Sequence, residues 1–172
     1  RNSVIADMRH VEFIPFRLTD IVDIFSIQID GKDKTELQEF IITFKNSQNI
    51  NFQKDFEQVV NSLVGIGEHG AKESFFRPEG KMKDRVCAIP LYSSHEKSKK
   101  QNGTLRLYCI RISDKLLIVG GGGLKITQTY EEDETLLKHV QTLQSIDYEL
   151  FKIENEGKDL HKEIYNLTIQ IN

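Results

Sequence analysis

An arginine and a tyrosine within the apolar segment 104–130 are the residues of this chain best suited to chemistry. Two β-rich runs, 105–112 and 116–119, flank a short polar connection, which is typical of an antiparallel hairpin. Because side chains alternate along a strand, Arg106 and Tyr108 point away from the face that carries Leu105. A guanidinium in the middle of a strand either binds an anionic group on an open face or is covered by an acidic side chain. The sequence leaves both interpretations open.

A conventional catalytic centre is not evident in the rest of the sequence. No serine lies in a nucleophile-elbow motif, and neither Cys87 nor Cys109 has an identifiable activating partner, so we expect both cysteines in the core. The histidines are His10, His69, His95, His139 and His161. They lie far apart without metal-ligand spacing, so we predict neither a metal nor another cofactor, and we expect His139 at a surface or boundary position rather than as a base. A cationic site can still cleave RNA, because arginine or lysine stabilises the charge that develops when the 2′-hydroxyl attacks phosphorus.

Four consecutive glycines, 120–123, follow the second run of the hairpin. A phosphate-binding loop would need a Gly-Lys-Ser/Thr ending and a helix directly afterwards, and the sequence has neither. We therefore expect the glycines to allow a bend, a bulge or a close approach of another backbone. A small-molecule anion site between Gly120 and Lys125 is a weaker alternative.

Hydrophobic periodicity predicts the elements that position this hairpin. Helical spacing predicts a helix over 34–45 with Asp33 as its cap and a last helix capped by Asp133. Between them it predicts a second helix that begins after Asn51, has its last apolar position at 66 and fails at Gly65, Gly67 and Gly70. Alternation predicts strands over 11–16, 73–77, 85–92 and, as an edge strand, 167–171. The segment 19–30 is apolar but irregular, so it does not distinguish strand from helix. We predict an α+β fold in which a small antiparallel sheet packs against an N-terminal helical pair and a C-terminal helix.

Length and composition bound the kind of protein. The 172 residues suit one domain, which we place at 11–156, between an N-terminal tail over 1–10 and a C-terminal extension over 157–172. No apolar run approaches the roughly 20 residues that span a bilayer, and no basic-then-apolar signal segment is evident. We therefore expect a cytoplasmic protein without a membrane partner.

The charge of the chain is unevenly distributed. The whole chain carries −3, whereas the segment 77–125 carries +7 from eleven Lys/Arg and four acids, which leaves −10 for the remainder. A basic sheet of this kind suits an anionic partner, of which nucleic acid is the commonest. The alternative is that the basic and acidic regions neutralise each other within the fold.

The order of these elements resembles the RelE/HigB superfamily of toxin–antitoxin ribonucleases. The resemblance rests on the segments 105–112, 115–120 and 124–130, which look like the family's Tyr-Arg strand, its following apolar strand and its basic segment before the last helix. Arg106 matches the family's mid-strand arginine, Lys125 its basic residue after the final strand, and Tyr130 its late tyrosine. The resemblance implies a metal-independent endoribonuclease that acts on mRNA or at the ribosome and is neutralised by a helix-turn-helix antitoxin.

Further residues are expected to bind RNA on this resemblance. They are Arg77, Lys81, Lys83, Arg85, Tyr108 and Arg111. The chain departs from the family where Leu124 stands in place of a second basic residue, and in its overall acidity. A fold can persist after its activity is lost. A non-catalytic module that keeps the fold and binds protein or nucleic acid through the same face is therefore the alternative function.

Overall fold

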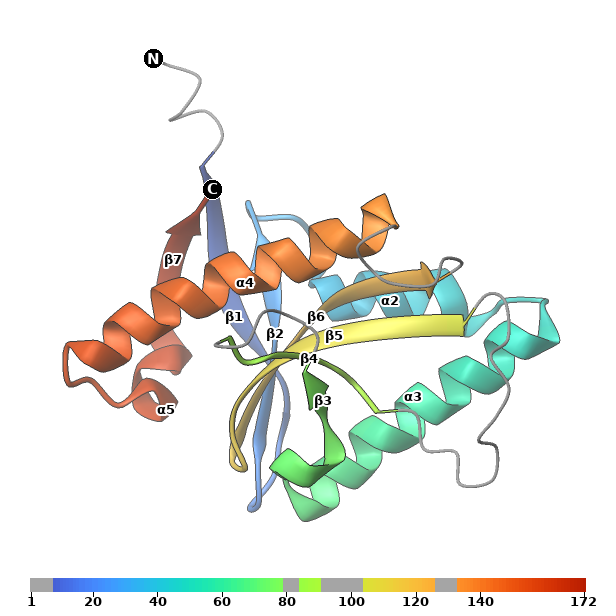
Figure 1. Ribbon diagram of the computed structural model, residues 1–172, viewed down its shortest axis with the longest axis horizontal. Coiled ribbons are helices and arrows are strands. Elements are labelled where there is room, and N and C mark those ends of the chain that lie inside the picture. Colours follow the sequence, from blue (N-terminus) through green and yellow to red (C-terminus); the bar gives the residue numbers. More distant parts are fainter. Residues whose placement is uncertain (1–7, 79–83, 91–103, 126–132) are drawn as a thin grey trace.

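The computed structural model describes residues 8–78, 84–90, 104–125 and 133–172 (Figure 1). Its strands are β1 (Arg9–Leu18), β2 (Asp23–Ile29), β3 (Arg77–Pro78), β4 (Val86–Ala88), β5 (Thr104–Ser113), β6 (Leu116–Lys125) and β7 (Thr168–Ile171). Its helices are α2 (Glu36–Lys45), α3 (Ile50–His69), α4 (Glu134–Asn155) and α5 (Leu160–Glu163), with short 3₁₀ turns η1 (Glu73–Phe75) and η3 (Ile164–Asn166). The predicted α+β class is confirmed.

The strands form one seven-stranded sheet in the order β3-β4-β5-β6-β2-β1-β7. The β1–β2 and β5–β6 hairpins are antiparallel, as are the pairs that add β3, β4 and β7. The two hairpins meet through β2 and β6, which run parallel. The expectation of a purely antiparallel sheet is therefore wrong, because the strands that join the two hairpins, β2 and β6, run in the same direction.

One buried serine fixes the junction between the hairpins. The Ser26 hydroxyl donates to the carbonyl of Val119 at 2.9 Å and accepts from the backbone N–H of Leu37 at 3.2 Å. It thereby ties β2 to β6 and to the first turn of α2. Beyond Ser26 the two strands separate, since their pairing ends at Ser26 and Val119. The second half of β6, which carries the glycines and Lys125, therefore pairs with β5 but not with β2.

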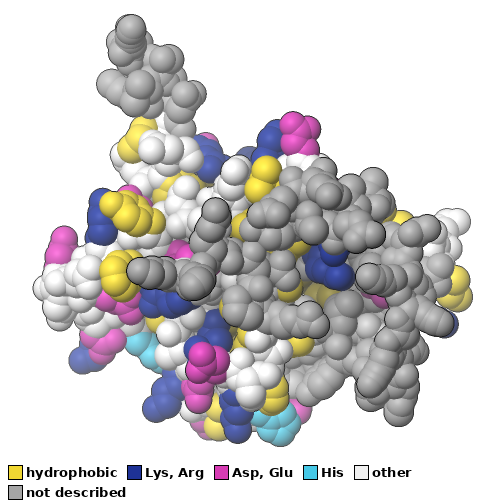
Figure 2. Space-filling model, in the orientation of Figure 1, with side chains coloured by type: hydrophobic (Ala, Val, Ile, Leu, Met, Phe, Trp, Pro, Cys, Tyr) yellow, Lys and Arg dark blue, Asp and Glu magenta, His cyan; other side chains and the backbone are white. Residues whose placement is uncertain are grey.

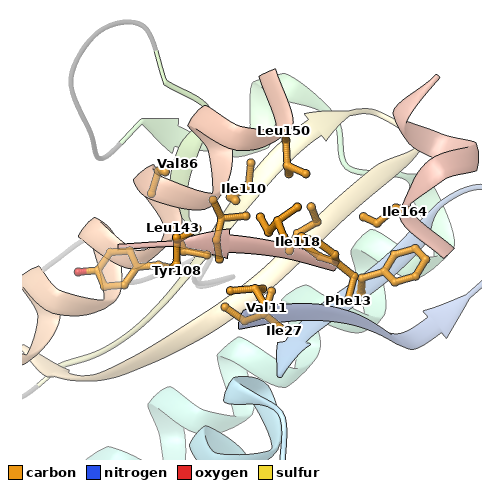
Figure 3. Close-up of a cluster of buried hydrophobic side chains, with 14 of the residues drawn as sticks. Val11, Phe13, Ile27, Val86, Tyr108, Ile110, Ile118, Leu143, Leu150 and Ile164 are labelled. Atoms are coloured by element: carbon orange, nitrogen blue, oxygen red, sulfur yellow. The ribbon is translucent and has the colours of Figure 1, made fainter. Parts of the chain in front are cut away.

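Helices cover both faces of the sheet and enclose two hydrophobic clusters. On one face α4 packs over Ile110 and Ile118 through Val140 and Leu143, as Figure 3 shows in part. On the other face α2 and α3 cover the opposite sides of β2, β5 and β6. Figure 1 shows α4 lying over one face of the long hairpin β5–β6, and most apolar side chains of the hairpin are buried.

The helices largely follow the periodicity, with two shifted ends. The cap of α2 is Thr35 rather than Asp33, because Thr35 and Gln38 form the reciprocal pair of hydrogen bonds that defines a capping box. Helix α3 continues beyond 66 and stops before Gly70, whose φ of 97° ends it. The Asp133 cap of α4 and its apolar stripe are confirmed.

The ends of the described chain contribute to the sheet. Residues 9 and 10 belong to β1, and β7 pairs with them from the C-terminal side, so the predicted edge strand is confirmed. The irregular segment 19–30 contains the strand β2. The predicted strand over 73–77 is instead the turn η1 followed by the short β3. Of the strand predicted over 85–92, Val86–Ala88 form β4, and residues 91 and 92 lie outside the described residues. None of the helices within the described ranges is long and apolar enough to cross a membrane.

Candidate functional site

The β5–β6 hairpin places Arg106 and Lys125 on the same face. Leu105 and Leu107 join the cluster under α2 and α3, whereas Tyr108 joins the cluster under α4, so the predicted alternation is confirmed. Arg106 pairs with Gly123, and Lys125 pairs with Thr104. Diagonal neighbours of this kind have Cα atoms about 7–8 Å apart, which is within reach of one phosphate for two long side chains.

Arg106 is half-buried and only partly neutralised. Its Nη1 donates to the carbonyl of Leu105 at 3.0 Å. The N–H of Leu105 donates to the Asp55 carboxylate at 3.1 Å, which brings an acidic group close to the guanidinium. Burial raises the pKa of Asp55 above its usual value, and the charge of Arg106 opposes that rise. None of the ion pairs found among the described residues involves Arg106, which favours an anion-binding arginine over a covered one.

Two of the other predicted cations have structural partners instead. Arg85 Nε lies 2.8 Å from the Asp147 carboxylate, and its Nη1 lies 3.0 Å from Glu154. Arg111 donates from Nε to the carbonyl of Ala71 at 2.7 Å and from Nη2 to Asp114 at 2.5 Å. These contacts hold β4 to α4 and the β5–β6 turn to the end of α3. The two arginines therefore support the fold rather than an open cationic face.

Tyr108 is not available for stacking on a nucleotide base. Its side chain is 1% exposed and lies among the core residues under α4 (Figure 3). The expectation that it binds RNA is therefore corrected, because a ring enclosed by α4 and the sheet offers no free face. Lys81, Lys83 and Tyr130 lie outside the described residues, and Arg77 is placed only by its backbone in β3, opposite Ala88.

The glycine segment is a bulge under α4. Leu107 pairs with Gly122 and Cys109 with Val119, so Gly120 and Gly121 together oppose Tyr108. A Cβ atom built on Gly120 would lie 2.8 Å from Leu143 of α4, and one on Gly122 only 1.9 Å from the carbonyl oxygen of Arg106. The expectation of a bulge with close backbone approach is confirmed.

A histidine and a carboxylate that the sequence did not bring together meet beside this bulge. His139 Nδ1 of α4 lies 3.8 Å from Glu36 Oε1 of α2, and a Cβ atom on Gly121 would come within 2.6 Å of the imidazole and 2.9 Å of Glu36. The His139 side chain is 25% exposed. His139 directly precedes Val140 of the α4 stripe, and Glu36 lies 103 positions earlier in the chain, so no local pattern pairs the two side chains.

The environment of His139 makes stability depend on pH. Burial lowers the pKa of His139 below 6.5, and Glu36 opposes this only partly. The unfolded chain therefore binds a proton more readily, so this contribution to stability is present above pH 6.5 and is lost as pH falls below it. We expect His139→Gln to lose less free energy of unfolding than wild type between pH 7.5 and pH 5.5 in urea titrations. Equal losses in the two proteins would contradict this assignment.

Other polar groups lie apart from the hairpin. An open groove of about 830 Å³ runs along the outer side of α4, where Arg9, Lys138 and Thr142 are among its lining residues. Asp23 Oδ2 accepts hydrogen bonds from His161 at 2.9 Å and Tyr165 at 2.6 Å, which joins the C-terminal segment to β2. Within the described ranges, no three His, Cys, Asp or Glu side chains group as metal ligands.

On the face shown in Figure 2, basic and acidic side chains lie side by side among the described residues. No family model matches the chain, and no curated protein or solved structure proved similar to it.

Proposed function

We propose that this chain is a RelE/HigB-like endoribonuclease in which Arg106 and Lys125 bind the RNA phosphate and Tyr130, which lies outside the described residues, positions the RNA. The observation that carries the proposal is the register of the β5–β6 hairpin. It sets Arg106 and Lys125 on one face, two positions apart across adjacent strands. Two cations at this spacing can contact the same phosphate and stabilise the additional charge of its transition state.

The contrast among the arginines supports this choice of residues. Arg85 contacts two carboxylates, and Arg111 contacts a carbonyl and a carboxylate. Arg106 has a carbonyl hydrogen bond and a nearby carboxylate, so most of its five N–H donors are not used in the contacts among described residues. The free energy of phosphate binding is more favourable at this guanidinium than at one that must first break an ion pair.

The expected protein partner, a type II antitoxin, should cover the sheet face that carries Arg106 and Lys125. A type II antitoxin that neutralises a cationic RNA site presents acidic or hydrogen-bond-accepting groups to it, because it competes with phosphate for the same donors. We expect Arg106 and Lys125 to contribute to both interactions.

RNA binding is the direct test of the phosphate site. Single-stranded RNA should bind wild type with an affinity that falls as salt rises, and Arg106→Ala and Lys125→Ala should each weaken binding about tenfold. Each variant should also reduce the slope of log affinity against log salt by about 0.7, which is the value for one lost contact to a single strand. Lys158→Ala, which removes an exposed lysine 54% accessible to solvent, is the matched control. A soluble wild type that binds no RNA at low salt contradicts the proposal.

Expression in a bacterial host tests the activity. Wild type should arrest growth and leave new mRNA ends, and soluble Arg106→Ala and Lys125→Ala proteins should not. Cleavage of RNA that is equally strong with both variants contradicts the assignment of these cations.

A non-catalytic protein-binding module is the second candidate, and one feature favours it. Leu18, Ile21 and Phe75 are 41–49% exposed, although they lie in or beside turns where polar residues are usual. The Thr19 hydroxyl donates to the carbonyl of Gly67, which holds the β1–β2 turn against the end of α3. Exposed apolar side chains such as Leu18 and Ile21, which flank this turn, suit a protein partner. This function predicts little RNA affinity at any salt concentration.

A further inference from the structure

The two cysteines of this chain face each other across adjacent strands. Cys87 of β4 pairs directly with Cys109 of β5. Both side chains belong to the hydrophobic cluster under α2 and α3, so the two thiols lie on the same face of the sheet. The sequence contains no other cysteine. Two opposed thiols can exchange with a disulfide and become linked, which a single core cysteine cannot do.

The contacts of the two sulfur atoms agree with this placement. Cys109 Sγ donates to the carbonyl of Cys87 at 3.5 Å, and Cys87 Sγ donates to the carbonyl of Arg85 at 3.6 Å. Burial raises the pKa of the Cys109 thiol, and the nearby Cys87 thiol raises this pKa further. The two thiols are therefore close neighbours within the cluster.

The backbone hydrogen bonds on either side define the spacing of the pair. The N–H of Ile89 donates to the carbonyl of Leu107 at 2.8 Å. The N–H of Arg111 donates to the carbonyl of Arg85 at 3.1 Å. Hydrogen-bonded pairs recur every two residues along antiparallel strands, so the two cysteines form such a pair, with Cα atoms about 5.5 Å apart. This spacing suits a disulfide, whose Cα atoms are usually about 5.5–6 Å apart.

We propose that Cys87 and Cys109 form a reversible cross-strand disulfide when the protein meets a small-molecule disulfide. This modification goes beyond the proposed function, because it needs neither RNA nor the cations of the β5–β6 hairpin. The bond joins β4 to β5 and closes the segment 87–109 into a covalent loop.

The exchange balances with a small-molecule disulfide such as oxidised glutathione as the oxidant. Cys87 is 8% exposed and Cys109 is 0% exposed, so Cys87 reacts first. Its thiolate attacks one sulfur of oxidised glutathione, forms a mixed disulfide and releases one glutathione thiolate. Cys109 then loses its proton and attacks the Cys87 sulfur, which releases the second glutathione. The cysteines lose two electrons and two protons, and the two glutathione molecules gain them.

The geometry of the pair makes this bond easy to reduce. The Cβ atoms of opposed residues lie about 4.5–5.5 Å apart, whereas a disulfide prefers about 3.8 Å, so the two strands must approach each other. Strand β4 can make this movement, since it has three residues and pairs on its other side with the two residues of β3. The strain that remains favours reduction, and strained disulfides are the labile and regulatory ones.

Oxidation of the folded full-length chain is the test. Wild type is incubated with oxidised glutathione under native conditions, quenched in acid and analysed by intact mass and by titration of free thiols. We expect both thiols to be lost and the monomer to be lighter by two hydrogens, and dithiothreitol should reverse both changes. The oxidised protein should also unfold at a higher urea concentration than the reduced protein, because the bond restricts the unfolded chain.

Single variants assign the reaction to this pair. Cys109→Ala should retain glutathione as a mixed disulfide on Cys87, whereas Cys87→Ala should keep its thiol free, because Cys109 is buried. Neither variant should show the upward shift of the urea midpoint.

The measurement on wild type decides the proposal even if a variant fails to fold. Thiols that stay free in the folded protein overturn it, whether or not the bond forms in urea. A disulfide between two chains also overturns it, as does a stable glutathione adduct on Cys87 of wild type.

Discussion

Replacing Gly122 with alanine is expected to lower the free energy of unfolding by more than about 4 kcal/mol, a large part of the roughly 5–15 kcal/mol that stabilises a typical domain. A Cβ atom at this position would lie 1.9 Å from the carbonyl oxygen of Arg106 and 2.8 Å from the Cα of Leu107. Both atoms belong to the backbone of β5, so no side-chain rotation relieves the overlap. The two strands would have to separate in the middle of the sheet.

Gly123→Ala is the matched control for this prediction. The nearest atom to a Cβ there is a methyl carbon of Leu136 at 3.6 Å, which is ordinary contact. Because glycine weakens a strand interior, this variant should be as stable as wild type or slightly more stable. Urea denaturation of both variants checks the pair. A Gly122→Ala protein with wild-type stability would show that the β5–β6 register is wrong.

The sequence predicts those parts of the fold that depend on local periodicity. The stripe of α4 and the alternation of β5 are both visible in single segments, because burial of one face repeats every 3.6 or 2 residues. The cap of α2 is harder to predict, since Asp33 and Thr35 each begin a segment with the spacing of a capping box. The structure uses Thr35, whose partner Gln38 reaches back to its backbone N–H at 2.8 Å.

Pairings between distant segments are not encoded in this way. The parallel junction joins Asp23–Ser26 to Leu116–Val119, and nothing in either segment specifies the direction of the other. The same limit applies to the site. Arg106 and Lys125 share a hairpin and could be paired from the sequence, whereas His139 and Glu36 meet only through the packing of α4 and α2 around Gly121.

The position of each cation explains why net charge is a poor guide to the site. The segment 77–125 carries a large positive charge, but Arg85 and Arg111 use theirs to hold elements together. Both interpretations of the charge pattern are therefore partly right. Some of the basic side chains neutralise acidic ones within the fold, and a smaller set on the β5–β6 hairpin can meet an anionic partner.

Replacing Asp147 with alanine is expected to lower the free energy of unfolding by about 3–5 kcal/mol. The Asp147 side chain is 7% exposed and accepts hydrogen bonds from Arg85 Nε at 2.8 Å and from the Arg85 backbone N–H at 3.0 Å. Its removal leaves a partly buried guanidinium with one carboxylate, Glu154, and leaves a backbone donor without its acceptor. Asp147→Asn should lose less, because the amide keeps an oxygen for one of the two donors.

Glu149→Ala is the control, since it breaks the exposed pair with Lys152 on the same helix and should cost less than about 0.5 kcal/mol. Chemical denaturation of the three variants measures the difference. The result also bears on function, because an Arg85 held by Asp147 cannot turn toward RNA without breaking a buried pair. If Asp147→Ala were as stable as wild type, Arg85 would be free to leave α4, and it would have to be counted with Arg106 and Lys125 among the candidate phosphate contacts.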